Sequence, residues 1–126
     1  MECLWFLIAI VLIISDELHS FLMWNLFNDF YIVFAGIIKS HVNTTLQAWI
    51  IHEGIEAIFH FIILTFVFSI VLLNPITGLI IGFIGGLVHF IIDLYHSFYA
   101  SNMNSIEHRA LHFVIESLVF ILIFGL

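Results

Sequence analysis

The sequence predicts an all-α protein: a polytopic integral membrane helix bundle of four to five transmembrane helices, forming a single domain over residues 1–126. Of the 126 residues, 63% are hydrophobic and 17% aromatic, and only 9% are charged. Soluble domains are roughly half apolar and a quarter charged. At about 20 residues per crossing, the chain has room for four or five spans and little else. We therefore expect a multi-pass protein of the cell membrane.

Three of the expected spans follow directly from the order of apolar and polar segments. Residues 46–73 are a long apolar run that ends at Asn74-Pro75, a pair that favours a turn because proline disfavours helical geometry in the residue before it. Residues 76–98 resume at once, which predicts an antiparallel helical hairpin. A last span is expected at about 106–126, with Ser105 as its N-cap.

The first forty residues allow two interpretations. The apolar run LWFLIAIVLII is only eleven residues long, and the polar segment SDELHS follows it. In the interpretation we favour, a short first helix ends there, Asp16, Glu17 and His19 form an outer loop, and residues 20–38 return as a second helix. In the other, one long or bent helix carries these charges inside the protein.

The distribution of charge predicts the orientation and excludes one class of partner. The net charge is −7, from nine acidic residues against two basic ones, so a basic nucleic-acid surface is absent and no nucleic acid is expected as a partner. The two basic residues, Lys39 and Arg109, are separated by two complete crossings and so lie on the same side. The positive-inside rule places that side in the cytoplasm.

Histidines and carboxylates recur at matching depths on the three clear spans. Each of these helices carries two histidines and a carboxylate at spacings of three and four, which places each triplet on one helix face. Counted from the outer surface at about 1.5 Å per residue, one layer lies at roughly 20 Å, a second at roughly 25–27 Å and a third at roughly 30 Å. These layers are, in order, His60, His89 and His112; Glu56, Asp93 and His108; and His52 and His96.

This pattern predicts a metal site. An ionisable side chain inside a membrane costs several kcal/mol unless it is paired, wetted or bound to metal, and by default it marks a functional site. Imidazole and carboxylate suit divalent transition metals, with Zn or Fe the expected ions, and helix bundles hold one- and two-metal sites of this kind. We expect the site in the cytoplasmic half of the bundle. Its predicted ligands are His52, Glu56, His60, His89, Asp93, His96, His108, His112 and Glu116.

The remaining polar residues are given other roles. Glu56 and Asp93 are the candidate catalytic residues, as a general base, although either can instead be a ligand or orient an imidazole. Glu53 and Glu107 are interpreted as solvated charges near the helix ends. Glu116, which is deeper than the histidine layer, is also a candidate proton relay.

Outside the predicted ligand set, several positions have simpler interpretations. His41 follows Lys39 in a polar loop and is expected at the surface. Asn28 and Asp29 offer a contribution from a fourth helix. Glycines 78, 82 and 86 recur every fourth residue, which predicts close helix packing along that face.

Two short motifs resemble those of known membrane enzymes. The segment HRALH, from His108 to His112, resembles the HRxxTH element of membrane-bound metal-dependent hydrolases, and HFIID, from His89 to Asp93, resembles their HxxxD. Order and surroundings differ from that pattern, so no residue role is taken from it. His108 and His112 also form an HxxxH pair similar to those of histidine-box lipid desaturases and hydroxylases, whose doubled HxxHH boxes are missing here. We assign the chain to neither family.

Three functions remain open at this point. The leading one is a metal-dependent membrane enzyme acting on a lipid-like substrate, as a hydrolase or an oxygenase. The second is a transition-metal or proton transporter, although the outer half of the predicted spans offers few polar side chains that could bind an ion along a path. The third is a b-type haem protein that uses two of His60, His89 and His112 as axial ligands. Membrane lipid is the expected partner, a homo-oligomer is possible, and the substrate is not specified by the sequence.

Overall fold

The computed structural model describes residues 3–125, and within them the chain is helical without strands. This confirms the predicted all-α class. The helices are α1 (Leu4–Phe21), the π-helix η1 (Leu22–Leu26), α2 (Asn28–His41), α3 (Thr45–Val71), α4 (Pro75–Tyr99) and α5 (Ser105–Phe124).

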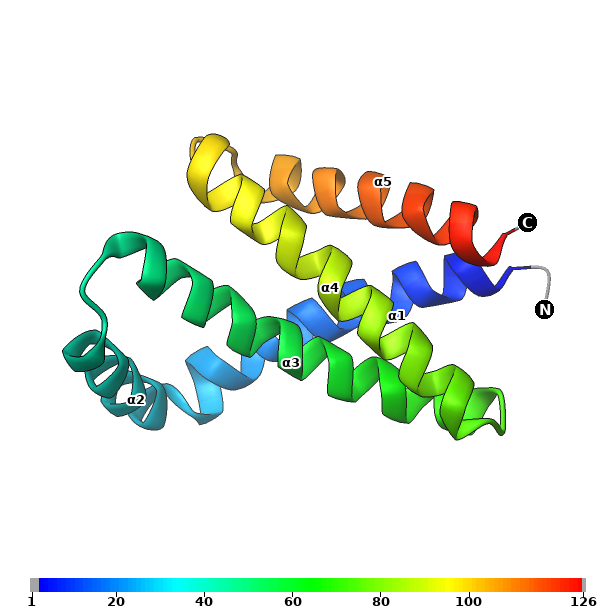
Figure 1. The fold of residues 1–126 in the computed structure, drawn as a ribbon, viewed down its shortest axis with the longest axis horizontal. Helices are drawn as coiled ribbons and strands as arrows, with labels where there is room; N and C mark the ends of the chain where they lie inside the picture. The colour runs from blue at the N-terminus through cyan, green and yellow to red at the C-terminus, as the bar shows by residue number, and fades with distance from the viewer. Residues whose placement is uncertain (1–2, 126) are drawn as a thin grey trace.

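Four long helices form the bundle, and α2 lies outside it. Helices α1, α3, α4 and α5 run along the length of the molecule, while α2 is set across one end (Figure 1). Helix α1 packs against α3, α4 and α5. Both chain ends and the α3–α4 turn lie at one end of the molecule, which we call the terminal end. The α2–α3 and α4–α5 connections lie at the other, which we call the loop end (Figure 1).

The helix boundaries follow from local capping. The Asn74 side chain accepts hydrogen bonds from the first backbone N–H groups of α4, and Pro75 is the first residue of that helix, so the predicted turn is confirmed. Helix α5 begins with a capping box between Asn104 and Glu107. The N-cap is thus Asn104, one residue before the predicted Ser105, because the Asn104 side-chain oxygen accepts hydrogen bonds from the free N–H groups of Ile106 and Glu107.

Helices α3 and α4 pack closely through the glycines of α4. A Cβ atom at Gly82 would lie 2.1 Å from Thr65 Oγ1 and 2.7 Å from the Phe61 carbonyl oxygen. At Gly78 it would lie 2.6 Å from the backbone nitrogen of Ser69. Side chains at these positions would push the two helices apart, so the predicted packing role of the glycine stripe is confirmed.

The favoured prediction for the first forty residues is wrong. Helix α1 continues without a break through Asp16, Glu17 and His19, and η1 extends it to Leu26. These polar residues do not form an outer loop, because they have partners inside the bundle or on its rim. His19 contacts Glu56 of α3, and Glu17 pairs with Arg109 of α5. The alternative is closer to the observed course: one helix carries these residues across the bundle, but it ends at Leu26, and the separate helix α2 begins at Asn28.

Within residues 3–125, three helices are long and apolar enough to cross a membrane: Leu4–Leu26, Thr45–Val71 and Pro75–Tyr99. Helix α5 has 20 residues, about 30 Å of helix, but it carries Glu107, Arg109 and Glu116. Helix α2 has only 14 residues. Many outward side chains are large and apolar, among them Phe66 and Leu122, as a lipid-facing surface requires.

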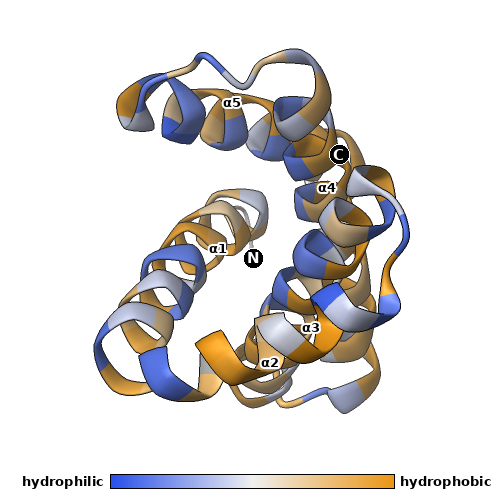
Figure 2. Ribbon diagram, turned by 90° about the vertical axis from the view of Figure 1, so that its left-hand side faces the viewer, coloured by the Kyte–Doolittle hydropathy of each residue, from blue (hydrophilic) through white to orange (hydrophobic). Residues whose placement is uncertain are grey.

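Apolar and polar interiors occupy different halves of the bundle. The terminal half is filled by a buried apolar cluster of Ile8, Ala9, Leu12, Leu64, Phe68, Ile81 and Phe120. The buried ionisable residues lie nearer the loop end. In Figure 2, which looks onto the loop end, hydrophilic segments occur on α1, α3, α4 and α5. The fold therefore collects the charged groups from four helices in one half of its interior.

Candidate metal centre

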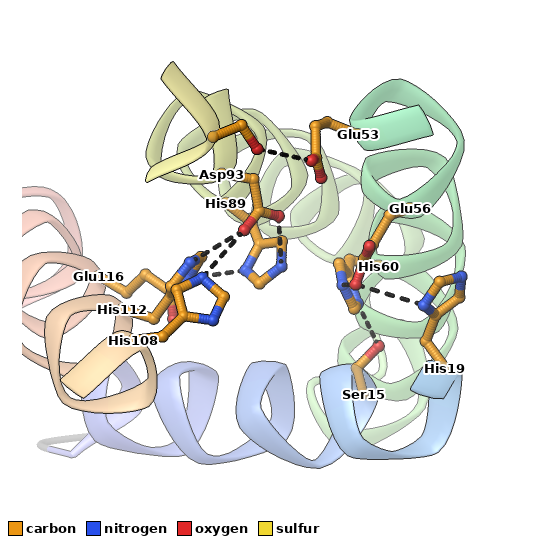
Figure 3. Close-up of polar contacts among 11 residues, drawn as sticks. Ser15, His19, Glu53, Glu56, His60, His89, Asp93, His108, His112 and Glu116 are labelled. Atoms are coloured by element: carbon orange, nitrogen blue, oxygen red, sulfur yellow. Dashed lines mark hydrogen bonds and ion pairs between the residues drawn. The ribbon is translucent and has the colours of Figure 1, made fainter. Parts of the chain in front are cut away.

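Three imidazoles from three helices form the middle of the polar half. His60 of α3, His89 of α4 and His112 of α5 are all buried. The ring centroids of His60 and His89 are 4.3 Å apart, and those of His89 and His112 are 4.5 Å apart. His89 lies between the other two (Figure 3). The layer predicted from helical depth is thus a row of imidazoles in direct contact.

Helices α4 and α5 build a closed ring of two imidazoles and two carboxylates. His89 Nδ1 lies 2.8 Å from Glu116 Oε1, and His89 Nε2 lies 3.1 Å from Asp93 Oδ2. His112 repeats this arrangement, with Nδ1 2.9 Å from Glu116 Oε1 and Nε2 3.0 Å from Asp93 Oδ1. Each helix supplies a histidine and a carboxylate four residues later, and the helices are antiparallel. The carboxylates therefore lie on opposite sides of the imidazole pair.

The ring cannot be satisfied by neutral imidazoles alone. A neutral imidazole has one N–H donor and one acceptor nitrogen, yet both nitrogens of His89 and of His112 face carboxylate oxygens. His112 Nε2 and Asp93 Oδ2 are buried and make no hydrogen bond. An unprotonated imidazole nitrogen and a carboxylate oxygen that face each other are both acceptors, and they repel unless a proton or a metal ion lies between them. The arrangement consequently calls for added positive charge.

The α4–α5 cluster, defined as the ring plus His108, extends toward the loop end. His108 Nε2 lies 3.5 Å from Asp93 Oδ1 and is itself buried without a hydrogen bond. Asp93 therefore faces three imidazoles, those of His89, His108 and His112. Its contacts are those of a ligand or of a group that orients ligands.

A second group of polar side chains joins α1 to α3. We call Ser15, Asp16, His19, Glu56 and His60 the α1–α3 cluster. The Ser15 hydroxyl lies 2.7 Å from His60 Nδ1, so it fixes the orientation of that ring. The opposite nitrogen, Nε2, lies 3.7 Å from Glu56 Oε1 and makes no hydrogen bond. The same Glu56 oxygen lies 3.3 Å from His19 Nδ1.

Several sets of these residues could hold an ion, since in each set one potential ligand atom per residue lies within 4.8 Å of the others. In a tetrahedral zinc site, ligand atoms are about 3.3–3.5 Å apart, because each is about 2.0–2.1 Å from the metal. Around Asp93, the distance to His108 Nε2 is of this size, at 3.5 Å, whereas the distances to His89 and His112 are shorter, at 3.1 and 3.0 Å. His89 belongs to two of the sets, which makes adjacent ions possible. The sets are Asp16, Glu56, His60 and His89; His89, His112 and Glu116; Asp93, His108 and His112; and His52, Glu53 and Glu56.

The outermost predicted ligands have weaker positions. His52 joins a set only with Glu53 and Glu56, toward the loop end. His96 stacks on His108 at a centroid distance of 4.0 Å. Among the residues the structure describes, His96 belongs to none of the sets. Seven of the nine predicted ligands thus fall in the two clusters.

The prediction missed residues from the first helix and misplaced Glu53. Asp16 and His19 were placed in a loop, but they complete the α1–α3 cluster. Their spacing of three, on the same helix face as the small Ser15, was a signal available in the sequence. Glu53 is buried and accepts a hydrogen bond from Ser97, at 3.0 Å, and so is not a solvated end charge.

Other predictions about single residues can be compared with the structure. Glu107 is exposed and caps α5, and His41 is exposed at the end of α2. Both agree with the roles expected for them. Asn28 and Asp29 are exposed in the first turn of α2 and belong to none of the sets found within residues 3–125. Among the described residues, the fourth helix that contributes to these sets is α1.

Two cavities border the clusters. A cavity of about 30 Å³ lies between α1, α4 and α5, lined in part by Asp16, His89 and Glu116. Its size corresponds to about one water molecule or one ion. A second cavity, of about 140 Å³, is lined by His19, His52 and Glu56 among others. The clusters therefore border space for a small ligand.

Comparison with known protein families, with curated proteins and with solved structures finds no match. The chemical assignment consequently rests on the geometry of this chain. That geometry consists of His, Asp and Glu clusters with the composition and spacing of metal-binding sites.

Proposed function

We propose that the protein is an integral membrane metalloenzyme that holds one or two divalent transition-metal ions and acts on a lipid-like substrate. The single observation that carries the proposal is the closed ring of His89, Asp93, His112 and Glu116. Zn²⁺ or Fe²⁺ suits these nitrogen and oxygen ligands, and the single cysteine of the chain, Cys3, is exposed at the start of α1 and belongs to neither cluster.

Metal binding explains the ring better than hydrogen bonds between side chains do. Buried ionic groups are costly, and replacing them with apolar residues is often neutral or stabilising. This chain nevertheless buries His60, His89, Asp93, His112 and Glu116 together. An ion between facing nitrogen and oxygen atoms converts their repulsion into coordination and supplies the missing charge. It also removes the need for two adjacent imidazolium ions.

The apolar half of the bundle favours an enzyme over a transporter. The terminal half is closed by side chains such as Leu64, Phe68 and Phe120. The hydroxyls of Thr65 and Ser69 lie against the glycines of α4, where they offer no continuous path. An ion held in the polar half would meet an apolar barrier on the terminal side.

The contacts between the imidazoles favour ions over haem. Two axial histidines must leave room between their rings for the porphyrin plane. His60, His89 and His112 form a row with centroid distances of 4.3 and 4.5 Å. Neighbouring rings in this row leave no such gap.

Of the two candidate catalytic residues, Glu56 has the better position. Asp93 is surrounded by imidazoles, which fits a ligand or an orienting group. Glu56 contacts His19 and His60 on one side and lines the 140 Å³ cavity on the other. A metal ion would supply a bound hydroxide or an oxygen-binding position. Glu56 would accept or return the proton on the cavity side.

We assign the loop end to the cytoplasm. Lys39 is near the end of α2, and Arg109 is in the second turn of α5. Both positions are at the loop end (Figure 1). The positive-inside rule then places the clusters in the cytoplasmic half of the membrane.

Isotope labelling tests the proposed reaction. Metal-loaded protein in lipid nanodiscs would be incubated with a panel of lipid esters, lipid phosphates and free fatty acids, in H₂¹⁸O or under ¹⁸O₂. We expect ¹⁸O in a lipid-derived product from one of the two sources, and loss of that product in Glu56→Gln with the metal retained. Metal-dependent ion flux into vesicles, abolished in His60→Ala, with no labelled product would instead establish a transporter.

A further inference from the structure

A further cavity lies between α2, α3 and the end of the helix formed by α1 and η1. Its volume is about 510 Å³, within the range of roughly 300–1,000 Å³ that is typical of small-molecule sites. Helix α2 contributes Phe30, Phe34 and Ile38 to its wall, and α3 contributes Ala48 and Ile55. Apolar side chains therefore make up most of the surface available to a ligand.

The cavity has a polar end with a single cation. Lys39 lines it together with the adjoining segment from Val42 to Thr45. Among the residues that the structure describes, no carboxylate pairs with Lys39, whereas Arg109 is paired with Glu17. The ammonium group is thus available to an anionic ligand. Because the chain carries a net charge of −7, one cation suits a monoanion better than a doubly charged phosphate.

The other end of the cavity leads to the α1–α3 cluster. His52 and Ile55 are seven and ten residues beyond Thr45 on α3, which places them about 10–15 Å further along the helix. His19, Met23 and His52 line both this cavity and the 140 Å³ cavity that contains Glu56. A chain whose head lies at Lys39 would extend toward Glu56.

We propose that this cavity binds a long-chain carboxylate, with the carboxylate at Lys39 and the hydrocarbon chain directed toward His19, His52 and Glu56. The orientation presents chain carbons, and not the headgroup, to the metal clusters. This inference rests on the proposed function for the reaction that follows. The binding itself requires no metal, so the two can fail independently.

Fluorescence quenching by brominated fatty acids tests the binding. In the Trp5→Phe, Trp49→Phe background, the remaining Trp24 lines the 140 Å³ cavity beside Glu56. Metal-free protein in phosphatidylcholine nanodiscs would be titrated with 12-bromododecanoate, 2-bromododecanoate and 12-bromododecanol. We expect saturable quenching by 12-bromododecanoate and, at equal saturation, much weaker quenching by 2-bromododecanoate. The half-saturating concentration of 12-bromododecanol should be higher than that of 12-bromododecanoate.

Substitutions then separate the headgroup contact from the chain contact. Lys39→Ala should raise the half-saturating concentration of 12-bromododecanoate about tenfold, as expected for loss of a charge-assisted contact, and should leave that of the alcohol unchanged. Ala35→Phe, which fills the cavity from α2, should abolish the saturable component. Ala110→Phe is the matched control, at an exposed alanine of α5 away from the cavity.

Three results would overturn the proposal. One is quenching of Trp24 that rises linearly with the concentration of 12-bromododecanoate in the bilayer and is the same in Ala35→Phe. A second is a Lys39→Ala variant that binds the carboxylate as well as the parent does. The third is tighter binding of 12-bromododecyl phosphate than of the carboxylate. Failure of the parent protein to bind a transition metal would contradict the proposed function but not this binding.

Discussion

His89 and His112, on different helices, both reach the same oxygen of Glu116, at 2.8 and 2.9 Å. Helix α4 packs much more extensively on α3 than on α5. The shared carboxylate is therefore a principal polar link between α4 and α5. Anything that weakens it should affect both metal binding and the attachment of α5.

Replacing Glu116 with glutamine tests this link. The amide keeps the shape of the side chain but removes its charge and places NH₂ donors beside the two imidazoles. We expect metal affinity to fall about 10- to 100-fold, measured by competition with a chelator of known affinity. Glu107→Gln is the control, because Glu107 is exposed on the same helix and only caps its first turn. Equal affinity in the two variants would contradict the role of Glu116.

Replacing Gly82 with alanine tests the packing that holds α4 in register with α3. The new Cβ would lie 2.7 Å from the Phe61 carbonyl oxygen, so the helices must separate. We expect a loss of about 1–3 kcal/mol of stability, seen as a lower thermal unfolding temperature in detergent. Gly36→Ala is the matched control, since nothing lies within 4 Å of the position its Cβ would take. That variant should be neutral or slightly stabilising.

Accessibility of cysteines tests the course of the N-terminal segment. With α1 and η1 forming one helix, the start of α1 lies at the terminal end with the α3–α4 turn, opposite the α4–α5 connection (Figure 1). Cys3 directly precedes α1, Asn74 is in that turn, and Asn102 is in that connection. Native Cys3 should therefore react with an impermeant maleimide from the same side as Asn74→Cys in a Cys3→Ser background. Asn43→Cys and Asn102→Cys should react from the other side. Labelling of Cys3 together with Asn102→Cys would restore the two-helix interpretation.

Much of the candidate site could be predicted because helical geometry is regular. The depths of His60, His89 and His112 depend on a fixed rise per residue and on two reference points, the turn at Asn74-Pro75 and the C-terminal end of the last span. The same count could not place Asp16 and His19, because their location depends on whether charged residues end a span or face the interior. Which of these occurs depends on tertiary partners such as Glu56 and His60, and the local sequence does not show these partners.

The wrong prediction for Glu53 has the same cause as the wrong prediction for Asp16. Both residues were assigned to water because charged side chains near the end of an apolar run usually lie there. Ser97 and the polar half of the bundle satisfy Glu53 instead. Burial of a charge thus depends on neighbours far along the chain, here 44 residues away.

Metal content of the purified protein tests the central claim most directly. Protein prepared in detergent under reducing conditions and without chelators would be analysed for transition metals, alongside His60→Ala, His89→Ala, His112→Ala and His41→Ala. The account predicts at least one equivalent of a divalent transition metal per chain, lowered in each of the three buried variants and unchanged in the exposed His41→Ala control. Less than one equivalent in the parent protein, or buried variants that retain as much metal as His41→Ala, would contradict it.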